Sequence, residues 1–110
     1  MRIPGAKDLA KEVKRKMRDL IKQGKSLDAF CQLIVALNIN IDIPNIHYNP
    51  NIVGAETNEQ DAIISFDSKK RASTPDFVYH EWYHLILKQD HDTDYWAEIF
   101  VHDLLDDIED

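Results

Sequence analysis

One stretch decides the fold of this chain: VYHEWYHLIL, residues 78–87. Apart from two histidines and one glutamate, its side chains are all apolar or aromatic, so a helix here would be buried around most of its circumference. The residues before it are typical of a helix start, because Thr74 can cap the helix and Pro75 suits its first position. We therefore predict a central, largely buried helix over residues 75–89.

His80 and His84 are four residues apart, so they would project from the same face of that helix, one turn apart. Two imidazoles in this arrangement can each offer a nitrogen to one zinc ion at about 2.0–2.1 Å. Glu81 follows His80 directly, and its carboxylate could take a proton from a metal-bound water as the general base of a hydrolase. The alternative is a pair of hydrogen-bonded core histidines, but two imidazoles and a carboxylate are costly to bury without partners. The pattern therefore predicts one catalytic Zn²⁺ at this helix.

The third zinc ligand must come from another part of the chain. A last helix is expected over residues 93–108, packed antiparallel to the helix over residues 75–89 across a tight turn. Residues equidistant from the turn then lie side by side, which pairs His84 with Glu98 and His80 with His102. Glu98 and His102 are themselves one turn apart and share a face. Either of them can complete the site, with the other as a supporting hydrogen-bond partner.

Other polar residues are placed less directly by the sequence. Asp94 lies on the same line of the last helix, nearer its start, and His91 lies in the turn and could reach the metal only if the turn folds back. A zinc hydrolase that attacks a carbonyl also needs a group that stabilises the developing oxyanion near the zinc. The candidates for that role, among which the sequence does not choose, are Tyr48, Tyr83, Tyr95 and His91.

The rest of the chain supplies elements that would pack around this helix. Apolar periodicity predicts two helices before it, and short runs of β-forming residues predict three strands. The helices are expected at residues 6–23 and 27–37, and the strands at 39–43 (resuming at 46–48 after Pro44), 52–55 and 62–66, with a turn at 56–61. We thus expect one α+β domain over residues 1–110: two N-terminal helices, a small, mainly antiparallel three-stranded sheet, the HExxH helix and a C-terminal helix.

The net charge of −7 is divided unevenly along the chain. Residues 1–25 hold nine Lys or Arg and three Asp or Glu, whereas residues 90–110 hold nine acids and no Lys or Arg. An acidic chain is a poor candidate for nucleic-acid binding, which needs clustered positive charge. The basic helix at 6–23 is the exception, and it is either the solvated face of a packed helix or a surface for anionic lipid or nucleic acid.

Membrane and disulfide classes are disfavoured. No apolar run approaches the ~18–20 residues of a membrane span, and the N-terminus lacks the apolar segment of a signal peptide. The single cysteine, Cys31, allows no intrachain disulfide and no thiolate zinc cluster. We expect a soluble, cytoplasmic protein that is a monomer or a dimer.

Residues 78–86 resemble the extended signature of zinc-dependent peptidases, in which an uncharged pair separates the glutamate from the second histidine. The metzincin branch fits poorly, because it needs a glycine where this chain has Leu87 and a third ligand where it has Asp90. The gluzincin branch places its third ligand on a later helix. A chain of this length and order of elements is most similar to the minigluzincins, and the similarity covers essentially the whole chain.

This resemblance implies a zinc endopeptidase with Glu81 as the base. Most gluzincins use glutamate as the third ligand and the minigluzincins use histidine, which favours His102 over Glu98. An extended peptide substrate would pair with an edge strand at Ala62–Phe66. The same resemblance implies latency through the C-terminal segment 103–110, whose carboxylates could approach the zinc; a solvated acidic tail is the alternative.

A second class of function remains open from the residues alone. The HExxH helix could hold zinc in a non-catalytic or regulatory module whose cleft serves binding, and antirepressor-type HExxH proteins are related to that possibility. Metal content does not discriminate between these classes. Cleavage of a peptide that depends on Glu81 does.

Overall fold

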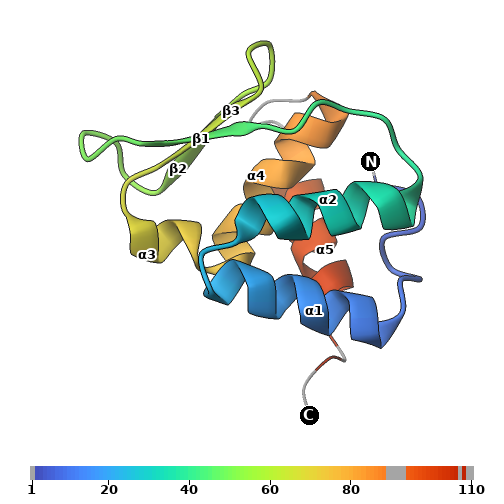
Figure 1. Cartoon of the computed structure of the whole chain (residues 1–110). Helices are drawn as coiled ribbons and strands as arrows, with labels where there is room; N and C mark the ends of the chain where they lie inside the picture. Colours follow the sequence, from blue (N-terminus) through green and yellow to red (C-terminus); the bar gives the residue numbers. More distant parts are fainter. Residues whose placement is uncertain (1, 89–93, 107, 109–110) are drawn as a thin grey trace.

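Five helices and a three-stranded sheet make up the part of the chain that the computed structural model describes, residues 2–88, 94–106 and 108 (Figure 1). The α+β class expected from the sequence is confirmed. In chain order the elements are α1 Lys11–Lys22, α2 Ser26–Leu37, β1 Asn45–Tyr48, β2 Ala55–Asn58, β3 Ile63–Phe66, α3 Lys69–Ala72, α4 Pro75–Leu87 and α5 Asp94–Leu105.

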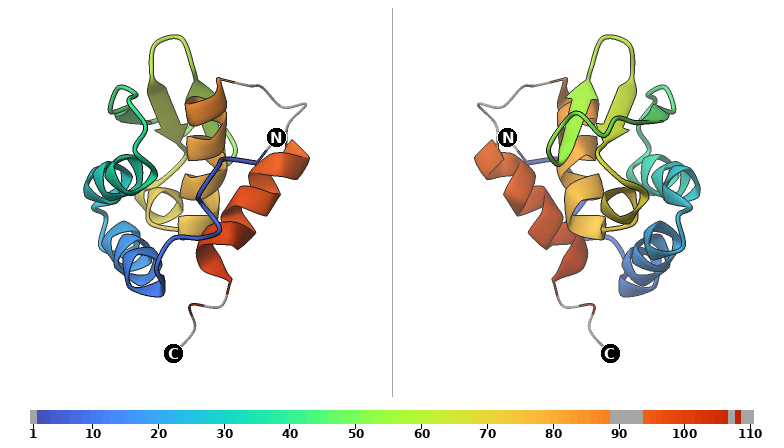
Figure 2. Two further views of the ribbon diagram at one scale, coloured as in Figure 1. Left: turned by 90° about the vertical axis from the view of Figure 1, so that its right-hand side faces the viewer. Right: turned by 90° about the vertical axis from the view of Figure 1, so that its left-hand side faces the viewer.

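Helix α4 is the centre of the molecule, as its sequence predicts. It contacts α1, α3, α5 and β2, and the side views show α1 and α2 on one side of it and α5 on the other (Figure 2). Pro75 stands in its first turn, after Thr74 in extended conformation. The helix ends at Lys88, whose φ of 51° and ψ of 45° are left-handed. The expected range of 75–89 was therefore correct to within two residues.

The core forms around the aromatic residues of α4. Trp82 is 1% exposed, and its ring lies 5.1 Å from the ring of Phe30 on α2. Tyr83 lies 6.1 Å from Phe100 on α5. Burying a large apolar side chain contributes about 1.5–3 kcal/mol to folding. These contacts therefore hold the helix that carries the HExxH motif between α2 and α5.

Tyr79 is a polar exception inside this core. Its side chain is 0% exposed, and its hydroxyl has no hydrogen-bond partner among the described residues. Burial raises the pKa of the hydroxyl well above its ordinary value. An unsatisfied buried hydroxyl costs free energy, while the apolar ring that carries it stabilises the core.

Tyr79→Phe is therefore expected to raise the free energy of unfolding by about 1 kcal/mol. Urea denaturation followed by tryptophan fluorescence measures this change. Tyr95→Phe is the matched control, because Tyr95 is 71% exposed and its hydroxyl is solvated, so its effect should stay within about 0.5 kcal/mol. A loss of stability in Tyr79→Phe would show that the hydroxyl has a buried partner.

The sheet is mixed, with the strand order β1-β3-β2. β2 pairs antiparallel with β3, as expected, but β1 pairs with β3 in parallel. The prediction of an edge strand at Ala62–Phe66 was wrong, because β3 is the central strand and both of its edges carry a neighbour. Ile64 and Phe66 on β3 are fully buried, which suits a central position. A peptide cannot pair there; among the described strands, the free edges belong to β1 and β2.

Two strand positions were misplaced by the sequence. Residues 39–43 form no strand, and their alternating isoleucines belong to a connecting segment in which Ile41 is half-buried and Ile43 is 51% exposed. The ladder begins only after Pro44, which lacks an N–H to donate. β2 starts at Ala55 because Gly54, with a φ of +87°, breaks the extended chain before it. The strand then runs through residues that the sequence had assigned to a turn.

Helix α1 starts later than its apolar pattern suggests. Residues 5–9 form short turns, in which Asp8 N donates to Gly5 O at 3.2 Å and Gly5 has a φ of +84°. Ala6, expected in the helix, is nevertheless fully buried. The N-terminal segment therefore packs on the core as turns, and α1 is regular only from Lys11.

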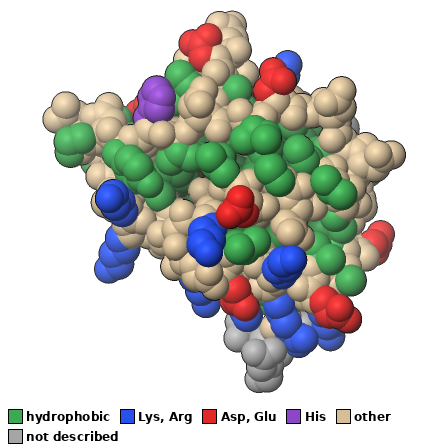
Figure 3. Space-filling view, in the orientation of Figure 1, with side chains coloured by type: hydrophobic (Ala, Val, Ile, Leu, Met, Phe, Trp, Pro, Cys, Tyr) green, Lys and Arg blue, Asp and Glu red, His purple; other side chains and the backbone are tan. Residues whose placement is uncertain are grey.

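The surface separates charged from apolar side chains. On the face seen in Figure 3, apolar side chains form a band across the middle, and Lys and Arg gather mostly below it, where α1 lies. Met17 and Ile21 of α1 are buried, and most of its basic residues turn outward, with Lys14 as the buried exception. In the part of the chain that the structure describes, none of the helices has the length and apolar character needed to cross a bilayer.

Candidate metal centre

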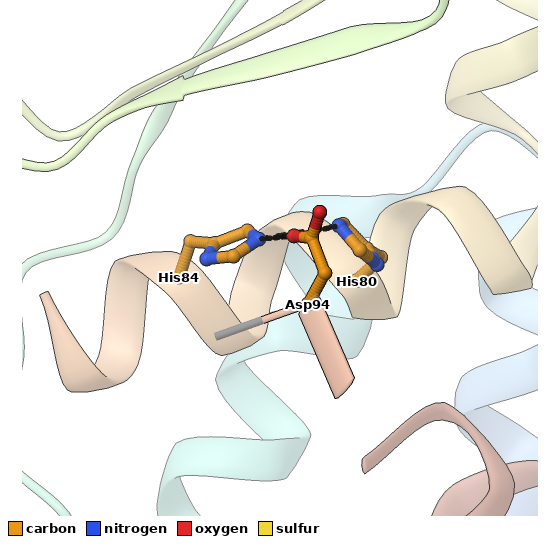
Figure 4. Close-up of side chains that lie close together, drawn as sticks. All are labelled: His80, His84 and Asp94. Atoms are coloured by element: carbon orange, nitrogen blue, oxygen red, sulfur yellow. Dashed lines mark hydrogen bonds and ion pairs between the residues drawn. The ribbon is translucent and has the colours of Figure 1, made fainter. Parts of the chain in front are cut away.

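Three side chains from α4 and α5 point toward one another (Figure 4). The Nε2 atoms of His80 and His84 are 3.2 Å apart. Asp94, the first residue of α5, brings its Oδ1 to 3.2 Å from His84 Nε2 and to 3.4 Å from His80 Nε2. The three atoms form a nearly equilateral triangle.

The size of this triangle fits a tetrahedral zinc site. With zinc bonds of about 2.0–2.1 Å, tetrahedral geometry places the ligand atoms about 3.4 Å from one another. The three observed separations, 3.2, 3.2 and 3.4 Å, are close to that value. The donor set of two imidazoles and one carboxylate also matches the ligands that zinc prefers, with one position left for water or substrate. The residues present therefore fit the metal that the motif implies.

Glu98 supports the site from behind His80. Its Oε1 lies 3.0 Å from Nδ1 of His80, on the other side of the imidazole ring from Asp94. A proton on Nδ1 that is donated to this carboxylate leaves Nε2 unprotonated, which is the state a metal ligand needs. Glu98 therefore occupies the supporting position that carboxylates commonly take behind a zinc-bound histidine. Of the two roles expected for Glu98, metal ligand or supporting hydrogen-bond partner, its position fits the second.

The site has a buried side and an open side. The His84 side chain is 5% exposed and that of His80 is 22% exposed, whereas Asp94 is 53% exposed. Edge-to-face contact of Tyr83 with the His84 ring, at 5.9 Å, closes the buried side. Among the described residues of the triangle, Asp94 and His80 are therefore the ones that solvent reaches.

The helix pairing differs from the expected one by four residues, about one helical turn. His80 lies beside Glu98 rather than His102, and His84 lies beside Asp94 rather than Glu98. Residues equidistant from a turn lie side by side only when the helix axes are parallel and the turn is symmetric, whereas α5 is inclined to α4 (Figure 2). The expected turn at 89–93, with His91 and Asp90, lies outside the described residues.

His102 is not brought to the histidine pair. Its side chain is 67% exposed, and its Nδ1 lies 3.3 Å from Oδ1 of Asp106. Among the described residues, the one group of side chains close enough to share a metal is His80, His84 and Asp94. In this structure Asp94, rather than the His102 expected from the family resemblance, lies where a third ligand would be needed.

The side chain of Glu81 contacts the sheet. Its Oε1 accepts a hydrogen bond of 2.9 Å from the hydroxyl of Thr57 on β2, and the same hydroxyl lies 3.2 Å from the backbone oxygen of Glu81. Glu81 is only 7% exposed. Even so, it lines a cavity of about 370 Å³ together with His80, Glu98 and Ala55. The Glu81 carboxylate and one histidine of the triangle therefore share one cleft beneath the edge strand β2.

The residues considered for oxyanion stabilisation are spread over the molecule. Tyr83 is fully buried among core side chains, and burial raises the pKa of its hydroxyl. Tyr48 is exposed on β1, the sheet edge away from β2. Tyr95 is exposed beside Asp94, with its ring against Trp96 at 5.3 Å. Of these three, Tyr95 alone adjoins the open side of the site.

The described residues of the segment 103–110 lie elsewhere. Asp103 forms an ion pair with Arg2 at 3.3 Å, and the carbonyl of Ile108 accepts a hydrogen bond of 3.0 Å from Arg15 on α1. Residues 107, 109 and 110 are outside the description. Latency through the C-terminus stays a prediction.

Thr57 is the contact that sequence reasoning missed. It stands in a run of polar residues assigned to a turn, and only its β-branched side chain between Glu56 and Asn58 signals a strand.

Comparisons with protein-family models, curated proteins and solved structures found no match. The chemistry inferred for this site therefore rests on its own geometry.

Proposed function

We propose that this chain is a zinc-dependent endopeptidase of gluzincin type, in which His80, His84 and Asp94 hold the metal and Glu81 is the general base. The observation that carries the proposal is the triangle of Nε2, Nε2 and Oδ1 atoms with sides of 3.2–3.4 Å, directly beside the Glu81 cleft. A bound zinc would supply Lewis-acid polarisation of the scissile carbonyl.

Glu81 is suited to move a proton in that cleft. Its carboxylate is held by Thr57 through one oxygen, Oε1, which leaves Oε2 to accept a proton from a water molecule. The scarcity of solvent around Glu81, which is 7% exposed, strengthens its interaction with a charged or polarised partner. After the attack, the same carboxyl group can give the proton to the departing amine.

Substrate binding is proposed at β2 in place of the refuted site on β3. β2 is the edge strand that contacts α4, and Ala55 on this strand lines the cleft with Glu81 and His80. An extended peptide can add to such an edge through its main-chain groups. The phenyl ring of Phe77, which is 39% exposed at the same cleft, can contact an apolar side chain of the peptide.

The proposal is tested by cleavage of casein and of quenched peptides with the zinc-loaded full chain. Removal of zinc with a chelator is expected to lower the rate to background, and one equivalent of zinc should restore it. Stoichiometric zinc binding without cleavage of any substrate would instead favour the non-catalytic zinc module. Cleavage that persists in the chelated protein would contradict the proposed chemistry.

A further inference from the structure

A second cavity lies on a different part of the surface from the metal centre. It measures about 500 Å³, within the range of small-molecule sites. The N-terminal segment, which runs between α5 and α1 (Figure 2), forms one wall of it. Four cationic side chains line it: Arg2, Lys7, Lys11 and Lys14. This concentration of positive charge is notable in a chain with a net charge of −7.

Lys14 is the unusual member of this group, because it is 7% exposed. Lysine is rarely buried to this extent unless it is paired. Its ammonium donates one hydrogen bond, of 2.8 Å, to the backbone oxygen of Lys7. Among the described residues no carboxylate pairs with Lys14, so two of its three donors are left for another acceptor. The Lys7 carbonyl fixes the position of the ammonium at the cavity wall.

The acidic residues of the cavity do not cancel this charge. Asp103 is paired with Arg2 at 3.3 Å, and Asp106 is hydrogen-bonded to His102 at 3.3 Å. With His102 neutral, the four cations exceed the two carboxylates by two charges. An anion that carries two charges and several acceptor oxygens would complement this wall, because lysine and arginine both bind such groups through charge-assisted hydrogen bonds.

We propose that this cavity binds the phosphate group of a small soluble molecule, with Lys14 as its central donor and with Lys11 and Arg2 at the rim. The site is separate from the zinc centre and does not depend on peptidase activity. A phosphate on a lipid headgroup has the same chemistry, so the experiment must separate the two sources. The half-enclosed cavity and the buried position of Lys14 favour the soluble form.

Inorganic phosphate is the probe, titrated into the full chain by calorimetry and by NMR at constant ionic strength. One saturable site with a Kd on the order of 1 mM or below is expected. Lys14→Met keeps most of the aliphatic stem and should raise the Kd at least about tenfold. Lys11→Met, an exposed position that does not threaten folding, should raise it about 2–5-fold.

Lys16→Met is the matched control, because Lys16 is exposed on the same helix and does not line the cavity. It should change the Kd by less than about twofold. Absence of saturable binding, or an equal loss in Lys16→Met and Lys14→Met, overturns the proposal. Binding to phosphatidic-acid vesicles that requires Lys14, with no binding of free phosphate, overturns it as well.

Discussion

Glu81→Gln is expected to lower the rate of peptide cleavage by about 10²–10⁴-fold, because the amide cannot accept the proton of the attacking water. The substitution keeps the shape of the side chain. Its Oε1 can still accept the hydrogen bond that Thr57 donates at 2.9 Å, so the local structure should persist. The initial rate with a quenched peptide, measured with zinc content and melting temperature, gives the result.

Glu56→Gln is the matched control for this prediction. Glu56 is an exposed carboxylate on β2, one residue from Thr57, and it does not line the cleft. Its removal should leave the rate within about twofold of the unchanged protein. If Glu81→Gln kept a tenth or more of the rate while binding zinc normally, the general base would have to be another residue.

Asp94→Ala is expected to weaken zinc binding by at least about 100-fold, since even partners behind a ligand are worth 10–100-fold in affinity. The Oδ1 of Asp94 completes the triangle with both Nε2 atoms. Competition with a chromophoric chelator measures the affinity.

Glu98→Gln should lower the zinc affinity less, by about tenfold, because the amide oxygen can still accept the hydrogen bond from His80 Nδ1.

The comparison with His102→Ala decides between the geometry and the family resemblance. His102 is 67% exposed and paired with Asp106, so its removal should leave zinc affinity within about twofold. The reverse order, with His102→Ala losing zinc and Asp94→Ala retaining it, would show that α5 shifts by about one turn when the metal binds.

The central helix could be predicted from the sequence because several signals agree there. Pro75 marks its start, apolar side chains surround the motif, and the spacing of His80 and His84 puts both rings on one face. The structure has the same helix, with the two Nε2 atoms 3.2 Å apart. Local spacing is sufficient for such a contact because the helix itself carries both histidines.

The sheet could not be predicted as well, because its order depends on contacts between distant segments. No local feature of Ala62–Phe66 distinguishes a central strand from an edge strand. The parallel pairing of β1 with β3 joins two segments that are separated in the chain by the whole of β2. The isoleucine alternation at 39–43 was a false strand signal, since period two requires only an extended chain with one covered side.

The helix pairing behind the predicted third ligand was displaced for a related reason. The pairing of α4 with α5 depends on the angle between the helices and on where each one ends, and Lys88 ends α4 in a left-handed conformation that no glycine announces. An error of one turn placed Glu98 beside His84, where the structure has Asp94. It likewise placed His102 beside His80, where the structure has Glu98. Contacts within one helix were therefore predicted from spacing, and contacts between helices were displaced.

X-ray absorption at the zinc edge, on the full chain loaded with one equivalent of zinc, tests the metal centre most directly. We expect one tightly bound ion per chain with two imidazole nitrogens at about 2.0–2.1 Å, at least one oxygen and no sulfur. Loss of the imidazole scattering in His84→Ala should follow. A shell of oxygens alone, unchanged by His84→Ala, would place the ion on surface carboxylates and rule out a zinc site on the HExxH helix.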